Sequence, residues 1–112
     1  MKAMHAICHY KDGKPDHFHS AGELGRYRSG TWKLAAEEAL SLKGGWLYLH
    51  ESSTKPAYLR ARIEALEGPD AEGKYWLIVQ KERTTGNVAW RGAVPTPSSY
   101  VRVVSATLVD EL

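Results

Sequence analysis

The sequence has very little cysteine, no long apolar run and almost no excess of one charge. Cys8 is the single cysteine among 112 residues, which excludes an intrachain disulfide. No apolar run approaches the roughly 20 residues that a membrane-spanning helix needs, and residues 1–10 hold no apolar stretch typical of a signal peptide. These absences favour a protein of a reducing, cytoplasmic compartment that does not contact a membrane.

The overall charge is close to balanced. Fifteen basic residues oppose thirteen acidic ones, which gives a net charge of +2 and a pI of about 8.7. A polyanion such as nucleic acid is usually bound by a concentrated basic patch. The composition therefore does not identify a nucleic-acid-binding protein, and only the local arrangement of the basic residues can argue for one.

Signatures of nucleotide-dependent and hydrolytic enzymes are also missing. The chain contains no Gly-x-Ser-x-Gly motif of a serine hydrolase. Its glycine pair Gly22 and Gly25 is not followed by the Gly-Lys-Ser/Thr ending of a phosphate-binding loop. His50 stands beside Glu51 and Ser52, which are suitable residue types for acid–base chemistry, but proximity in sequence does not establish a catalytic geometry.

Four histidines and the cysteine cluster in the first 19 positions: His5, Cys8, His9, His17 and His19. Zinc prefers nitrogen and sulfur ligands of these types. Their spacing matches none of the usual zinc motifs, so we predict neither a metal site nor a cofactor. The favoured interpretation is a solvated hairpin that carries the histidines, with Cys8 as a small buried apolar residue.

What is present is a series of short, alternating segments around one helix. The length favours a single domain, 1–112. Apolar alternation and β-favouring residues predict strands over 2–10, 46–50, 58–66, 75–82, 88–90 and 100–109. The polar, glycine-rich stretch 20–30 is typical of a loop. These elements predict a mainly β, α+β fold that closes into a small barrel with one principal helix.

The helix is predicted over 31–43. Ser29 or Thr31 can cap its first amides, and the acidic side chains of Glu37 and Glu38 fall near its positive end. Gly44 is well suited to the position after the last turn. The apolar side chains near helical spacing predict the buried stripe: Trp32, Ala35, Ala36, Ala39, Leu40 and Leu42.

Aromatic and basic residues form the strongest functional pattern. Four tryptophans in 112 residues is a high count, and aromatic faces can stack on nucleobases while arginines neutralise phosphates. The basic residues that could share a surface in the folded barrel are Arg26, Arg28, Lys33, Lys55, Arg60, Arg62 and Arg91. The alternative is that the tryptophans belong to the core and that the arginines form a solvated sheet face.

Residues 26–66 resemble the PUA-like superfamily, which includes EVE, ASCH and YTH domains. The segments that carry the likeness are 28–32 (RSGTW), 44–50 (GGWLYLH), the Lys55-Pro56 turn and 57–63 (AYLRARI). The resemblance implies a pseudobarrel with a cleft near the N-terminus of its helix. It also implies that this cleft binds RNA or a modified base in DNA.

We therefore predict a nucleic-acid-binding module rather than an enzyme, and no catalytic residue is assigned. Tryptophan and tyrosine side chains would stack, hydroxyls would donate hydrogen bonds and arginines would hold phosphates. The predicted site consists of Arg26, Arg28, Ser29, Thr31, Trp32, Trp46, Tyr48 and Arg60. Two alternatives stay open: a small ribonuclease that uses His50 with Lys55 or Arg60, and a protein-interaction or homodimerisation module.

Overall fold

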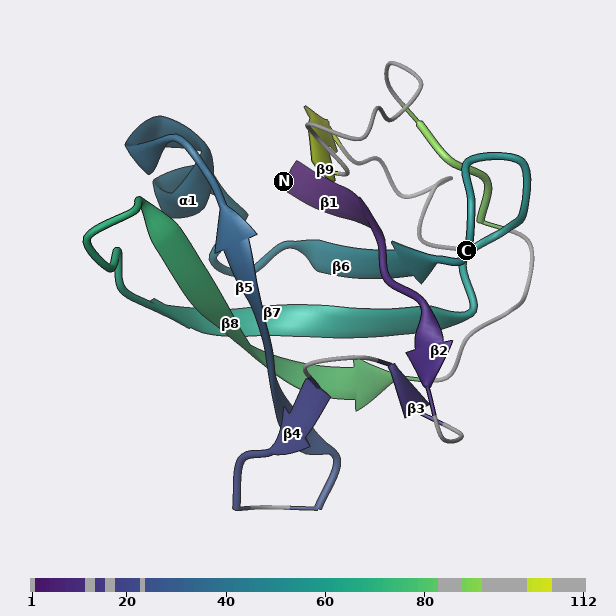
Figure 1. Cartoon of the computed structure of the whole chain (residues 1–112), viewed down its shortest axis with the longest axis horizontal. Helices are drawn as coiled ribbons and strands as arrows, with labels where there is room; N and C mark the ends of the chain where they lie inside the picture. Colours follow the sequence, from purple (N-terminus) through teal and green to yellow (C-terminus); the bar gives the residue numbers. More distant parts are fainter. Residues whose placement is uncertain are drawn as a thin grey trace.

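The protein folds as one twisted, mixed β-sheet with a short helix on one side (Figure 1). The computed structural model describes residues 2–11, 14–15, 18–22, 24–82, 88–91 and 101–105. Across the main sheet the strands follow in the order β4 (Phe18–Ser20), β5 (Arg26–Lys33), β8 (Lys74–Glu82), β7 (Leu59–Glu67), β6 (Trp46–His50), β1 (Lys2–Ile7) and β9 (Val101–Ser105). The strands β2 (Tyr10–Lys11) and β3 (Lys14–Pro15) form a separate pair.

The predicted mainly β fold with one helix is confirmed, but the sheet is not a closed barrel. Within the described part of the chain, β4 and β9 form the two edges and no ladder joins them. Figure 1 shows the strong twist of the sheet: β5 lies at a steep angle to β6 and β7, and β8 bends from a diagonal course to run alongside β7. Among the described residues, no helix has the length and apolar character needed to cross a membrane.

The helix α1 (Ala36–Leu42) is much shorter than the predicted helix 31–43. Thr31 and Trp32 belong instead to β5, where Trp32 pairs with Tyr75 of β8. Pairing with a long neighbouring strand outweighs the local helical pattern, and both residues have good β propensity. The predicted loop 20–30 is wrong over 26–30 for the same reason, because β5 begins at Arg26, whereas the described residues between β4 and β5 do form a loop.

The ends of α1 follow from the same shift. Ala35, not Ser29 or Thr31, precedes the helix, and its backbone amide donates to the carboxylate Oε1 of Glu38 at 3.3 Å. Glu37 and Glu38 lie in the first turn as expected. Gly44 follows the helix with a φ of 83°, a conformation that glycine adopts without strain.

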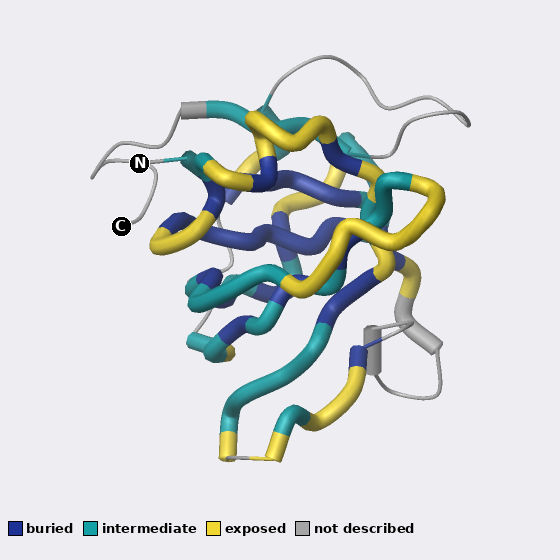
Figure 2. The backbone as a smooth tube through the Cα atoms, turned by 90° about the vertical axis from the view of Figure 1, so that its left-hand side faces the viewer, coloured by how far each residue is buried: buried dark blue, intermediate teal, exposed yellow. Residues whose placement is uncertain are grey.

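The main core lies between the sheet and α1, on what we call the inner face. Alternate residues of β6 and β7 point here, among them Leu47, Leu49, Ala61 and Ile63, and α1 contributes Ala39 and Leu42. Figure 2 shows that buried stretches gather in the central strands, while the connecting turns are exposed. The predicted buried stripe of the helix is wrong at Ala35, Ala36 and Leu40, which are exposed, Leu40 to 82%.

The opposite side of the sheet, the outer face, has its own small apolar cluster: Ala3, Trp46, Tyr48, Ala57 and Val88.

Residues 88–90, predicted as a strand, have no regular secondary structure. β9 covers 101–105, and the rest of the predicted strand 100–109 lies outside the described residues. The predicted strand 58–66 is confirmed over 59–66, which belongs to β7, although a register irregularity follows Ile63.

The turn between α1 and β6 depends on a close backbone approach at Gly45. A Cβ atom added to Gly45 would overlap the backbone carbonyl oxygen of Lys2, at the start of β1. The same atom added to Gly44 would meet nothing within 4 Å. Two adjacent glycines are therefore needed for different reasons: backbone conformation at Gly44, and space at Gly45.

We expect Gly45→Ala to destabilise the fold by at least about 2–3 kcal/mol, because β1 must move away from the helix end. Gly44→Ala is the matched control and should cost only about 1 kcal/mol, which reflects the strained φ of an alanine. Urea denaturation of both variants measures the difference. Equal losses at the two positions would contradict the close approach of β1 to Gly45.

Candidate functional site

The strand register brings polar, cationic and aromatic side chains into two rows on the outer face. One row crosses the sheet through Ala3, Trp46, Arg62, Gln80 and Arg26, which are direct neighbours on β1, β6, β7, β8 and β5. Successive residues of a strand point to opposite faces. The residues two positions along each strand from the first row therefore form a second row on the same face. That row contains Arg102, His5, Tyr48, Arg60 and Glu82.

Trp46 holds the guanidinium groups of two arginines. The Cζ atoms of Arg60 and Arg62 lie 4.3 and 4.1 Å from the centre of the Trp46 ring. Arg62 also donates from Nη1 to the backbone carbonyl of Gly44 at 3.0 Å. Because a delocalised guanidinium stacks well on an indole, this pair concentrates positive charge over β6 and β7.

A second arginine–tryptophan stack lies towards the other edge of the sheet. The Cζ atom of Arg28 is 4.6 Å from the centre of the Trp76 ring, and the ring of His19 lies 5.9 Å from it. Arg28 also pairs with Glu67 at 2.9 Å. A Cβ atom at Gly30 would lie only 2.9 Å from the Trp76 ring, so glycine is required for the indole to lie over β5.

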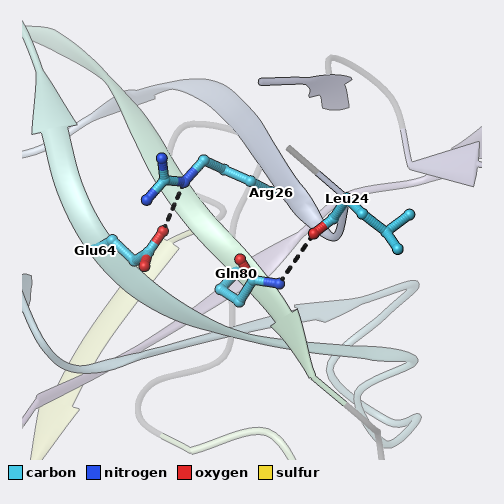
Figure 3. Close-up of polar contacts among 4 residues, drawn as sticks. All are labelled: Leu24, Arg26, Glu64 and Gln80. Atoms are coloured by element: carbon cyan, nitrogen blue, oxygen red, sulfur yellow. Dashed lines mark hydrogen bonds and ion pairs between the residues drawn. The ribbon is translucent and has the colours of Figure 1, made fainter. Parts of the chain in front are cut away.

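Arg26 is held by an ion pair across the sheet. Its Nε donates to Oε1 of Glu64 at 2.9 Å, and both side chains are about one-third exposed. Figure 3 shows this pair above β8, next to Gln80, whose side-chain amide donates to the backbone carbonyl of Leu24 at 3.4 Å. An ion pair at this exposure contributes roughly 0–1 kcal/mol, so Arg26 can exchange partners at little cost.

Five of the eight predicted site residues share the outer face: Arg26, Arg28, Trp46, Tyr48 and Arg60. Trp46 and Tyr48 are 3% and 0% exposed, however, so they support the arginines or the core rather than forming open stacking walls. The sequence pattern identified the right strands, while the burial of their aromatic residues depends on neighbours from β1 and from residues 57 and 88.

Two of the other three predicted residues, Ser29 and Trp32, do not join this face. Ser29 is buried and its hydroxyl accepts a hydrogen bond from Nε1 of Trp32 at 3.2 Å, and Trp32 packs against the inner core. Thr31 is exposed within β5. Residues 29–31 therefore do not form a site at a helix N-terminus, because they belong to a strand and α1 begins five residues after Thr31.

Residues left out of the predicted site complete the face. Trp76 alternates with the buried residues Tyr75 and Leu77, so strand periodicity alone could have placed it on the outer face. Arg62 has the same periodicity as Arg60. No signal in the sequence indicates that Arg102 lies opposite His5, since that requires the pairing of the first strand with the last.

His5 and His50 form a buried pair at one end of the outer face. The Nδ1 atom of His5 lies 2.8 Å from Nε2 of His50, and Nδ1 of His50 lies 3.0 Å from the backbone carbonyl oxygen of Lys55. A carbonyl oxygen only accepts, so His50 carries its proton on Nδ1. In its neutral form Nε2 must then accept from His5.

The surroundings of this pair are aromatic. His5 stacks on Tyr48 with ring centres 4.9 Å apart, and Trp90 meets both histidines edge-on. His5 therefore does not lie on a solvated hairpin as expected, whereas Cys8 is buried as expected. His17 lies outside the described residues, and no group of metal-ligating side chains occurs within the described part of the chain.

Burial lowers the pKa of His50 below its usual value, although the hydrogen bond to the Lys55 carbonyl acts in the opposite direction. Both ring nitrogens have partners and the ring has no exposed surface. The geometry therefore does not present His50 to solvent as a general base.

Neither a protein-family model, nor a curated protein, nor a solved structure matches this chain.

The lowered pKa of His50 predicts that acid destabilises the fold. Between about pH 6.5 and the lower pKa of the folded state, the unfolded chain binds more protons, so the free energy of unfolding falls as the pH falls. The loss amounts to about 1.4 kcal/mol for each unit by which folding lowers the pKa. Denaturant titrations between pH 7.5 and pH 5 measure it.

His50→Asn should reduce this pH dependence, because the amide can replace the Nδ1 donor but does not titrate. The exposed His19 offers a matched control, and His19→Gln should retain the wild-type slope. A slope that is the same in His50→Asn and the wild type would assign the acid sensitivity to other groups.

Proposed function

We propose that the protein binds single-stranded nucleic acid across the outer face of its sheet. The observation that carries the proposal is that five arginines and three glutamates lie together on this face. Three of the arginines stack on a tryptophan, either Trp46 or Trp76. The basic members are Arg26, Arg28, Arg60, Arg62 and Arg102, and the acidic ones are Glu64, Glu67 and Glu82. An extended strand of phosphates matches such a surface better than a single small anion does.

Trp76 is the best candidate for contact with a base. Its side chain is only partly buried, in contrast to Trp46, and Arg28 and His19 border its ring. A base can stack against such a group without moving any core residue. Unpaired bases expose their faces, whereas bases in a duplex are stacked on each other, so the arrangement favours a single strand.

The ion pairs on the face do not prevent phosphate binding. Arg28 and Glu67 are 40% and 54% exposed, so their attraction is strongly screened by water. A phosphate offers more acceptor oxygens to a guanidinium than one carboxylate does. Glu64 and Glu67 would then orient Arg26 and Arg28 over the sheet until a phosphate displaces the two carboxylates.

The resemblance to PUA-like domains supports the same class of ligand and suggests RNA or a modified DNA base as its finer identity. The contact surface we propose differs from the one that the resemblance implied, because it uses the sheet rather than the helix end. The alternative of a ribonuclease that uses His50 receives no support, because the imidazole is buried and both of its ring nitrogens have hydrogen-bond partners.

The binding affinity for a labelled oligonucleotide of about 12 nucleotides, either oligo(dT) or oligo(U), tests the proposal. It is measured by fluorescence anisotropy at several salt concentrations. We expect Trp76→Ala to weaken binding by about 5- to 150-fold, which corresponds to the loss of one base stack of about 1–3 kcal/mol. Arg62→Ala should reduce the salt dependence by about 0.7 in the slope of log K against log salt, the value for one lost phosphate contact on a single strand.

The matched control for charge is Lys81→Ala. Lys81 lies on β8 but pairs with Ala61, a residue of the inner face, so its removal takes away one positive charge without altering the outer face. This variant should keep the wild-type slope. Absence of salt-dependent binding by the wild type at low ionic strength, or an equal effect of Lys81→Ala and Arg62→Ala, would overturn the proposal.

A further inference from the structure

The helix side of the molecule has an apolar groove next to a protruding apolar side chain. The groove has a volume of about 410 Å³, and Ala39, Leu66, Pro69 and Tyr75 are among the residues that line it, together with Leu40 and Lys43 at the helix. Leu40 is 82% exposed. A single exposed leucine is ordinary, but a leucine beside an unfilled apolar groove is typical of a contact surface.

We propose that this surface pairs with the same surface of a second copy of the chain, in an antiparallel arrangement of the two α1 helices. The projecting group and the groove lie on one patch, so a two-fold axis beside Leu40 would direct each leucine towards the groove of the other copy. Such self-complementarity is what an isologous dimer requires. A different partner would require only one of the two features.

The charges of α1 and of Lys43, the residue that follows it, fit this arrangement. Glu37 and Lys43 are exposed and lie three residues before and three residues after Leu40. In an antiparallel pair centred on Leu40, Lys43 of one copy lies at the height of Glu37 of the other, about 4.5 Å along the helix from the axis. Opposite charges thus meet at both ends of the contact, whereas parallel helices would bring like charges together.

The contact is small, since α1 has seven residues and spans only about 10 Å. It falls below the roughly 1,200 Å² of standard stable interfaces, so the dimer should be transient. Its formation leaves the outer face free, because α1 covers the inner face of the sheet. The inference is therefore independent of the proposed nucleic-acid binding.

Sedimentation velocity from about 10 μM to about 1 mM tests the inference over the range in which small interfaces dissociate. The wild-type mass should rise with concentration, and Leu40→Glu should weaken association at least about tenfold. Leu24, which is fully exposed on the hairpin between β4 and β5, provides the matched control. Leu24→Glu should associate as the wild type does.

Charge reversal tests the antiparallel geometry without altering the apolar contact. Lys43→Glu alone should weaken association, and the double variant Glu37→Lys with Lys43→Glu should restore it. A wild type that stays monomeric throughout the range overturns the inference, as does an equal effect of Leu24→Glu. A Leu40→Glu variant that unfolds at lower urea while the wild type is monomeric would also overturn it, and would assign the groove to another part of the same chain.

Discussion

The alternation of side chains along β7 is the constraint on which the structure depends. Leu59, Ala61 and Ile63 enter the inner core, so Arg60 and Arg62 must lie on the other face. A shift of pairing by one residue would exchange these sets and bury two guanidinium groups among apolar side chains. The register that maximises apolar burial is therefore also the register that assembles the arginines over Trp46.

The parallel pairing of β1 with β6 adds a second level of organisation. It joins residues that are more than 40 positions apart, and it places His5 directly beside Tyr48. The same pairing brings His5 next to His50, and the two imidazoles are buried among aromatic rings. A chain of hydrogen bonds runs from His5 to His50 and ends at the backbone carbonyl of Lys55. Burial at this depth is tolerated because each imidazole supplies a partner for the other.

Strands were predictable where one face is apolar and the other polar, as in β7, and the local stop at Gly44 was equally clear. The start of the helix was not, because Trp32 fits the helical apolar pattern, and only its pairing with Tyr75 of β8 places it in a strand. The candidate site shows the same limit. Sequence periodicity indicates that Arg60 and Arg62 share a face, but the burial of Trp46 depends on β1 and on residues distant along the chain.

The stacking of two guanidinium groups on Trp46 has a thermodynamic consequence. A free arginine side chain loses up to about 2 kcal/mol of rotamer entropy when it becomes ordered around a ligand. Arg60 and Arg62 have lost part of that freedom during folding, in contact with a ring that the core itself holds in place. An anion arriving at this part of the sheet would meet arginine side chains that folding had already partly ordered.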